Sequence, residues 1–93
     1  MNYAGLKNAA WEANMELHRR GLVLYTWGNA SQIDREKGVI AIKPSGVPYS
    51  SLEPQDMVVV DLDNRVVEGS LNPSSDTATH THLYRVFETI GGV

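Results

Sequence analysis

Residues 57–69, Met-Val-Val-Val-Asp-Leu-Asp-Asn-Arg-Val-Val-Glu-Gly, decide the fold that the rest of the chain must complete. Residues 57–62 are rich in valine, whose branched side chain suits a pleated sheet, so they predict a strand. Asp63 and Asn64 form a tight turn, after which residues 65–69 predict a second strand. The stretch therefore predicts an antiparallel hairpin.

Two further runs before this hairpin also predict strands. Residues 22–27, Leu-Val-Leu-Tyr-Thr-Trp, and residues 39–42, Val-Ile-Ala-Ile, are separated by a charged turn over residues 34–38. We expect these two runs to pair as a second β-hairpin. Proline and glycine in residues 43–46, Lys-Pro-Ser-Gly, end the strand, and residues 51–56 have room for about one helical turn.

Amphipathic helices are predicted at both ends of the chain. Apolar residues recur at helical spacing over residues 3–20, where Asn2 is an available cap and Gly21 suits the residue that closes the helix. A second helix follows Ser75 or Asp76, either of which can cap it. The apolar positions are Leu6, Ala10, Ala13 and Leu17 in the first helix and His80, Leu83, Tyr84, Phe87 and Ile90 in the second.

The order helix, strands, helix predicts an α/β protein of the α+β type, with an antiparallel-rich central sheet covered by helices. The last residues, Ile90-Gly91-Gly92-Val93, predict the end of the second helix and the first residue of a new strand. We therefore expect the sheet to be incomplete at the carboxyl end.

Composition excludes several classes of partner. The 93 residues carry a formal charge of −3, which gives no electrostatic reason to expect binding to nucleic acid or to an anionic membrane. Without cysteine, neither a disulfide nor a thiolate metal site is available. The first residues lack a signal-peptide pattern and no apolar run is long enough to span a membrane, so we expect a cytoplasmic protein.

Three loops could hold a phosphate group. Residues 28–31, 43–46 and 73–76 combine glycine or proline with small hydroxyl or amide side chains, which present backbone N–H groups and short donors to an anion. Ser74 and Ser75 also stand at a predicted helix start, and Lys43 adds a positive charge. Each loop by itself is more typical of ordinary turn and capping chemistry, and the presence of three such loops strengthens the phosphate interpretation without making it the preferred one.

Two histidines and one carboxylate are candidate metal ligands. His80 and His82 are two residues apart in a predicted helix, so their side chains point to nearly opposite sides and we reject a shared metal site. We expect His80 to be partly buried and hydrogen-bonded and His82 to be solvated. Asp76 is the carboxylate best placed for function, although its position also suits a helix cap.

Taken together, these segments resemble the class II, metal-dependent aldolase/epimerase family, and most of all its L-ribulose-5-phosphate 4-epimerases. The matching segments occur in the family's order and spacing over essentially the whole chain. The resemblance implies that residues 1–93 are the amino-terminal portion of a single class II aldolase-like domain. The segments are residues 26–31, 42–47, 56–60, 67–69, 73–77 and 90–93.

The resemblance also implies a reaction and its residues. An epimerase of this family interconverts L-ribulose 5-phosphate and D-xylulose 5-phosphate by retro-aldol cleavage and re-addition, assisted by zinc, in a homotetramer. Asp76 matches an acidic catalytic position beside the metal, where aldolases typically carry glutamate, and the aspartate favours the epimerase. The residues implied in phosphate binding are Asn29, Lys43, Ser45, Gly46, Ser74 and Ser75.

The family's histidine metal ligands follow the Gly91-Gly92 segment and are absent from this chain. We therefore expect these 93 residues to bind zinc weakly, to have no epimerase activity by themselves and to be poorly stable. Two alternatives to the epimerase stay open. One is a sugar-phosphate class II aldolase, and the other is a non-catalytic module that binds phosphate or a partner.

Overall fold

The computed structural model describes residues 2–93. Within this range, helix α1 (Ala4–Arg19) precedes strands β1 (Ser31–Asp34) and β2 (Val39–Ile42), and helix α2 (Thr77–Val86) follows strands β3 (Val58–Asp61) and β4 (Val66–Glu68). Two short 3-10 helices, η1 (Tyr49–Ser51) and η2 (Pro54–Asp56), connect β2 to β3. This arrangement confirms the predicted α+β class.

The strands form one antiparallel sheet in the order β1-β2-β3-β4. Ile40 pairs with Ile33 on one side and with Val60 on the other. Strand β2 is thus internal, and so is the valine-rich β3, which continues through a turn at Asn64, where φ is +68°, into β4. The hairpin predicted from residues 57–69 is confirmed.

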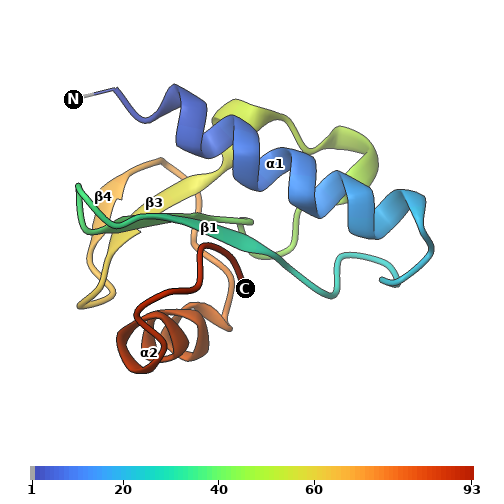
Figure 1. The fold of residues 1–93 in the computed structure, drawn as a ribbon. Coiled ribbons are helices and arrows are strands. Elements are labelled where there is room, and N and C mark those ends of the chain that lie inside the picture. The colour runs from blue at the N-terminus through green and yellow to red at the C-terminus, as the bar shows by residue number, and fades with distance from the viewer. Residues whose placement is uncertain (1) are drawn as a thin grey trace.

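The two helices cover opposite faces of the sheet, α1 on one side and α2 on the other (Figure 1). Alternate residues of a strand point to opposite faces, so the buried strands β2 and β3 supply both layers. The layer under α1 is a buried cluster of Ala10, Val39, Ala41, Leu52, Met57 and Val59. The layer against α2 is a second buried cluster of Ile33, Ile40, Ile42, Val58, Val60 and Tyr84.

Helix α1 matches its prediction closely. The Asn2 Oδ1 atom accepts a hydrogen bond from the Ala4 N–H at 2.8 Å and so satisfies one of the free donors of the first turn. At the other end Gly21 has φ +68°, and the Leu22 N–H donates to the Leu17 carbonyl at 3.0 Å. Glycine reaches this left-handed conformation without steric cost, which ends the helix.

The strand predicted over residues 22–27 is wrong. These residues form an irregular segment after α1, in which Tyr25 has φ +55° and is 79% exposed, while Trp27 is 65% exposed. Leu22 and Leu24 are also exposed. The partner of β2 is instead β1, so the predicted pairing of residues 22–27 with residues 39–42 is wrong as well. The left-handed backbone at Tyr25 is incompatible with a strand there.

Helix α2 is shorter than its apolar pattern predicted. It ends at Val86, and Phe87 lies beyond it, about half exposed. His80 and Tyr84 are buried as expected, and Ile90 packs against the second cluster from outside the helix. The Arg35 guanidinium donates to the carbonyls of Phe87 and Ile90 at 2.8 and 2.9 Å. These bonds fix the segment that follows the helix.

The last residues lie beside β1, as the sequence predicted for the start of a strand. The N–H groups of Ser31 and Val93 each donate to the other residue's carbonyl, at 2.8 and 3.2 Å. Gln32 and Gly92 form an antiparallel bridge in the same register. Among the described residues, no helix is long and apolar enough to cross a membrane.

Candidate functional site

The three loops predicted to hold a phosphate meet around one cavity of about 400 Å³. The first loop joins α1 to β1, the second follows β2, and the third precedes α2. The structure therefore brings together all of the residues that the sequence singled out for phosphate binding, and Asp76 with them. The lining residues are Thr26, Trp27, Gly28, Asn29, Lys43, Ser45, Gly46, Ser74, Ser75 and Asp76.

Backbone hydrogen bonds join the second loop to the third. The Ser45 N–H donates to the Asn72 carbonyl at 2.8 Å, and the Ser74 N–H donates to the Lys43 carbonyl at 3.0 Å. An isolated β-bridge lies between these two bonds. The loops therefore run side by side like a short piece of sheet, with Ser45 opposite Asn72 and Lys43 opposite Ser74.

Side chains tie the first loop to the other two. The Asn29 Nδ2 atom donates to the Asp76 Oδ2 atom at 2.8 Å, which links the first loop to the third. The Lys43 Nζ atom donates to the Thr26 carbonyl at 3.0 Å, which links it to the second. Each of the three loops thus contacts both of the others, so the cavity wall is a closed ring of contacts.

Lys43 is the cation of the cavity wall, yet its side chain is only 2% exposed. Its ammonium group donates to the carbonyls of Thr26 and Pro44, at 3.0 and 3.4 Å, and lies 4.9 Å from the centre of the Tyr49 ring. Burial lowers the pKa of Lys43. Its role in phosphate binding stays a prediction, and it also holds the first loop in place.

Asp76 precedes α2 but does not cap the helix with its side chain. Asp76 occupies the cap position, as expected for one of the two candidates, but its carboxylate accepts the hydrogen bond from Asn29 and makes no capping bond. Ser74 satisfies the neighbouring backbone: its Oγ atom accepts from the Asp76 N–H at 3.2 Å and its carbonyl accepts from the Thr77 N–H at 3.1 Å. The exposed Asp76 carboxylate and Ser75 remain at the cavity rim.

Two residues that shape this site were missed by the sequence analysis. Asn14 on α1 is fully buried, accepts from the Ala30 N–H at 2.9 Å and donates to the Ala30 carbonyl at 2.9 Å. Tyr49 donates to the carbonyls of Trp27 and Gly28. An asparagine four residues after Ala10, on the apolar face of a helix, was the feature that could have indicated the first of them.

A buried cluster of three polar side chains, Ser31, His80 and Tyr84, attaches α2 to β1. The Ser31 Oγ atom lies 2.7 Å from the His80 Nδ1 atom and 2.8 Å from the Tyr84 hydroxyl. Burial lowers the pKa of His80, and the nearby Asp76 charge partly opposes this. His82 is exposed. The expected hydrogen-bonded His80 and solvated His82 are confirmed, and they do not form a pair.

Comparison with known proteins identifies the family of this arrangement. Residues 8–93 match the family model of the Class II Aldolase and Adducin N-terminal domain. The chain belongs to this family. The fold of this class II aldolase domain is that of an L-fuculose 1-phosphate aldolase structure, to which it is 34% identical with a TM-score of 0.89.

Other solved structures agree with this assignment. An L-fuculose-1-phosphate aldolase from Thermus thermophilus is 32% identical, with a TM-score of 0.65 over 86% of this chain and 40% of its own. YgbL from Escherichia coli, at 24% identity and a TM-score of 0.83 over 96% of this chain and 42% of its own, shows the fold alone. The alignment with the L-fuculose 1-phosphate aldolase named above includes 99% of this class II aldolase domain, which spans only 43% of that protein's chain.

The zinc that the resemblance implies does not fit the described residues by themselves. Among residues 2–93, no group of three His, Cys, Asp or Glu side chains could hold a metal ion. Asp76 offers one carboxylate, whereas a catalytic zinc site takes three protein ligands. The described residues therefore do not form a catalytic zinc site by themselves.

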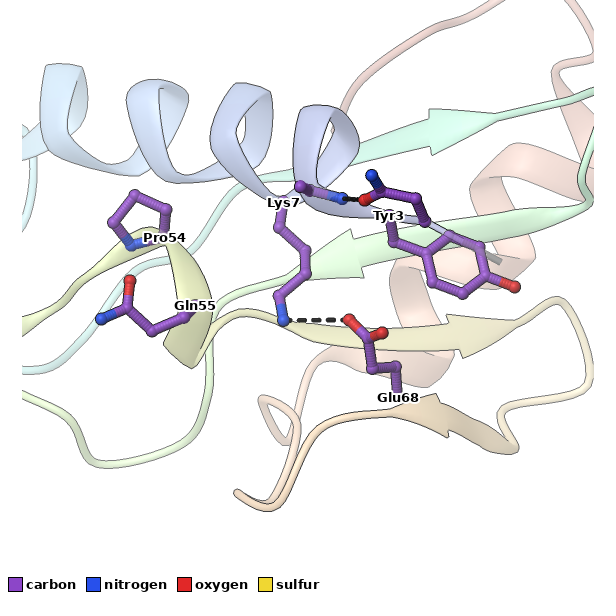
Figure 2. Close-up of a pocket in the computed structure, with 7 residues that line it drawn as sticks. Tyr3, Lys7, Pro54, Gln55 and Glu68 are labelled. Carbon is purple, nitrogen blue, oxygen red and sulfur yellow. Dashed lines mark hydrogen bonds and ion pairs between the residues drawn. The ribbon is translucent and has the colours of Figure 1, made fainter.

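A second cavity, of about 490 Å³, lies beside the first turn of α1 and contains none of the predicted site residues (Figure 2). Lys7 crosses it from α1 to reach Glu68 on β4, and their charged groups are 3.0 Å apart. Pro54 and Gln55 line it on one side of this pair and Tyr3 on the other. Because Lys7 already has a carboxylate partner, this cavity lacks the available positive charge that an anion would need.

Proposed function

We propose that the cavity between the three loops holds the phosphate group of a sugar phosphate, as the phosphate-binding part of a class II aldolase. The observation that carries the proposal is the convergence of Asn29, Ser45, Ser74 and Ser75 from three segments on one cavity beside Lys43. Similarity to L-fuculose 1-phosphate aldolases supports a ketose 1-phosphate of that type as the substrate. The implied reaction is reversible carbon–carbon bond cleavage.

The chemistry of the cavity wall suits a phosphate dianion. Hydroxyl groups of Ser45 and Ser75 and the amide of Asn29 are neutral donors, and the buried Lys43 ammonium supplies charge at short range. The positive end of the α2 helix dipole also lies next to Ser75 and Asp76 in the chain and favours an anion there. Holding the phosphate there would keep the substrate in one orientation while its carbon skeleton reacts.

Asp76 is the proposed catalytic residue. Its carboxylate lines the same cavity, and the hydrogen bond from Asn29 fixes its direction. A proton can therefore be exchanged at the Asp76 carboxylate while the phosphate stays in contact with the neighbouring Ser75. In the whole protein we also propose a zinc beside Asp76, held by residues outside this chain, and the homotetramer that the resemblance implies.

Binding of inorganic phosphate to the 93-residue chain tests the cavity directly. We expect Ser75→Asp to weaken binding about tenfold or more, because a carboxylate at the rim repels the dianion. Ser70→Asp is the matched control, since it adds the same charge at an exposed residue outside the lining. Calorimetric titration of both variants measures the difference, and equal affinities would contradict a phosphate site here.

An L-ribulose-5-phosphate 4-epimerase is the second candidate, and Asp76 favours it. The resemblance implies glutamate at this position in the aldolases, so the shorter aspartate favours the epimerase. The comparisons support an aldolase more strongly, because two L-fuculose 1-phosphate aldolase structures are 34% and 32% identical to this chain.

Product analysis separates the two candidates. A version of the chain extended to family length, with zinc, would be given L-fuculose 1-phosphate and L-ribulose 5-phosphate in separate reactions. We expect net release of an aldehyde and a three-carbon phosphate from the first substrate. Conversion of the second to D-xylulose 5-phosphate, without cleavage of the first, would instead establish the epimerase.

A further inference from the structure

Tyr49 binds the backbone of the first loop but is not among the residues that line the cavity. Its side chain is 2% exposed, and its hydroxyl lies 3.0 Å from the Trp27 carbonyl and 2.9 Å from the Gly28 carbonyl. Lys43 binds the carbonyl just before these, that of Thr26. Three consecutive carbonyl groups are therefore fixed by two buried side chains.

Fixing these carbonyls also fixes the neighbouring N–H groups. A trans peptide is planar, and its N–H points opposite to its C=O. The described residues contain no cis peptide bond, so the N–H groups of Gly28 and Asn29 must point away from the Tyr49 hydroxyl. Gly28 and Asn29 line the cavity, whereas Tyr49 does not. Within residues 2–93, neither N–H donates to another backbone carbonyl.

The Tyr49 ring is held by polar neighbours and belongs to neither hydrophobic cluster. It stacks on His18 at 5.0 Å with the two planes within 1°, and the Lys43 ammonium lies 4.9 Å from its centre. Tyr49 follows Pro48, whose extended backbone leads into η1. The hydroxyl is thus directed at the loop by contacts that a purely space-filling residue would not need.

We propose that Tyr49 is a positioning residue, which turns the peptide groups of residues 27–29 so that the N–H groups of Gly28 and Asn29 face a bound phosphate. Tyr49 itself does not contact the anion. The inference rests on the proposed phosphate site and adds two backbone donors to it. Successive N–H groups directed into one concavity form a strong anion site, since they cost no reorganisation when the ligand arrives.

Nuclear magnetic resonance of the ¹⁵N-labelled chain, titrated with inorganic phosphate, tests this role. We expect the Gly28 and Asn29 amide signals to shift strongly as phosphate binds. In Tyr49→Phe these two shifts should diminish. The phosphate Kd should rise about 5- to 10-fold, because the variant loses the hydrogen bond that orients the two peptide groups. The shifts of Gly46 and Ser75 should persist in the variant.

Trp11→Phe is the matched control. Trp11 Nε1 donates to the Leu52 carbonyl at 2.7 Å, so the variant also loses one side-chain hydrogen bond to a connecting segment, away from the cavity. We expect it to lower thermal stability to a similar extent while leaving the phosphate Kd within about twofold.

The outcomes distinguish the two proposals. Phosphate binding with an unchanged Kd in Tyr49→Phe would overturn the positioning role and leave the phosphate site intact. If Tyr49→Phe does not fold, the titration of the unchanged chain still tests the positioning role. Amide signals of Gly28 and Asn29 that do not shift with phosphate, while the Gly46 signal does, would overturn that role. Absence of any phosphate binding by the unchanged chain would contradict the phosphate site and the positioning role together.

Discussion

Replacing Asn14 by alanine removes the contact that joins helix α1 to the cavity loop. The Asn14 side chain is fully buried and makes three hydrogen bonds: two to the N–H and carbonyl of Ala30 and one to the carbonyl of Ala10, four residues earlier in the helix. In the variant, both backbone groups of Ala30 lose their partner. Ala30 is half-buried, so water replaces these bonds incompletely.

The size of the effect follows from these contacts. Each unsatisfied, partly buried backbone group costs about 1 to 2 kcal/mol, so the two groups of Ala30 together cost about 2 to 4 kcal/mol. Alanine has the higher helix propensity and returns about 0.5 kcal/mol. A complete domain of 93 residues has a free energy of unfolding of about 5 to 14 kcal/mol, and we expect this chain to lie at the low end of that range or below it. The variant should therefore lose a large fraction of its stability.

Denaturant unfolding followed by circular dichroism measures this loss. Asn8→Ala is the matched control, because Asn8 lies on the exposed side of the same helix and the substitution brings the same gain in helix propensity. We expect Asn14→Ala to unfold at a clearly lower denaturant concentration than Asn8→Ala. Free energies of unfolding that agree within about 0.5 kcal/mol would refute the reasoning, since the bonds to Ala30 would then contribute nothing.

Two further predictions concern the backbone of the first loop and the buried histidine. Gly28→Ala should lower the thermal stability of the chain more than Gly38→Ala. Both glycines have positive φ, but a Cβ at Gly28 would lie 2.3 Å from a Val23 methyl group, whereas no atom lies within 4 Å of a Cβ at Gly38. Equal losses of thermal stability in the two variants would show that this clash is absent. Burial lowers the pKa of His80, so the unfolded chain binds a proton more readily than the folded chain as the pH falls through about 6.5. The free energy of unfolding should therefore decrease from pH 7.5 to pH 5.5. This pH dependence should disappear in His80→Gln and persist in His82→Gln, and the reverse result would show that a group other than His80 titrates.

Local sequence patterns predicted the elements whose own residues determine them. Helix α1 has an apolar stripe and a closing glycine as expected, and Asn2 accepts a hydrogen bond from the first turn, although Tyr3 occupies the cap position itself. The valine-rich strand β3 is buried on both faces, so its composition alone indicated a strand. The turn at Asn64 then had few alternatives, because asparagine tolerates the left-handed conformation found there.

Strand β1 could not be predicted in this way. Its sequence, Ser31-Gln32-Ile33-Asp34, contains one large apolar residue, whereas the preceding run of residues 22–27 contains several. The structure forms the strand at the polar segment because it pairs with β2 on one edge and with Val93 on the other. Pairing over such separations in the chain overrides local β-propensity.

The sequence predicted which residues line the candidate site but not which residues hold its loops in place. Residues implied by the resemblance, such as Asn29 and Ser75, do meet at one cavity, and their phosphate-binding roles stay predictions. The supporting residues Asn14 and Tyr49 act on backbone groups of distant loops. A one-dimensional pattern does not show which carbonyl a buried side chain reaches, and only the packed structure does.

The ring of contacts between the three loops makes ligand binding a property of the folded chain as a whole. The cavity draws its lining from residues between 26 and 76, and hydrogen bonds attach its loops to both helices. An anion held there at 100 times its Kd would add about 2.7 kcal/mol to the free energy of unfolding. Phosphate should therefore act as a folding ligand, and resistance to proteolysis in its presence would report the integrity of the entire domain.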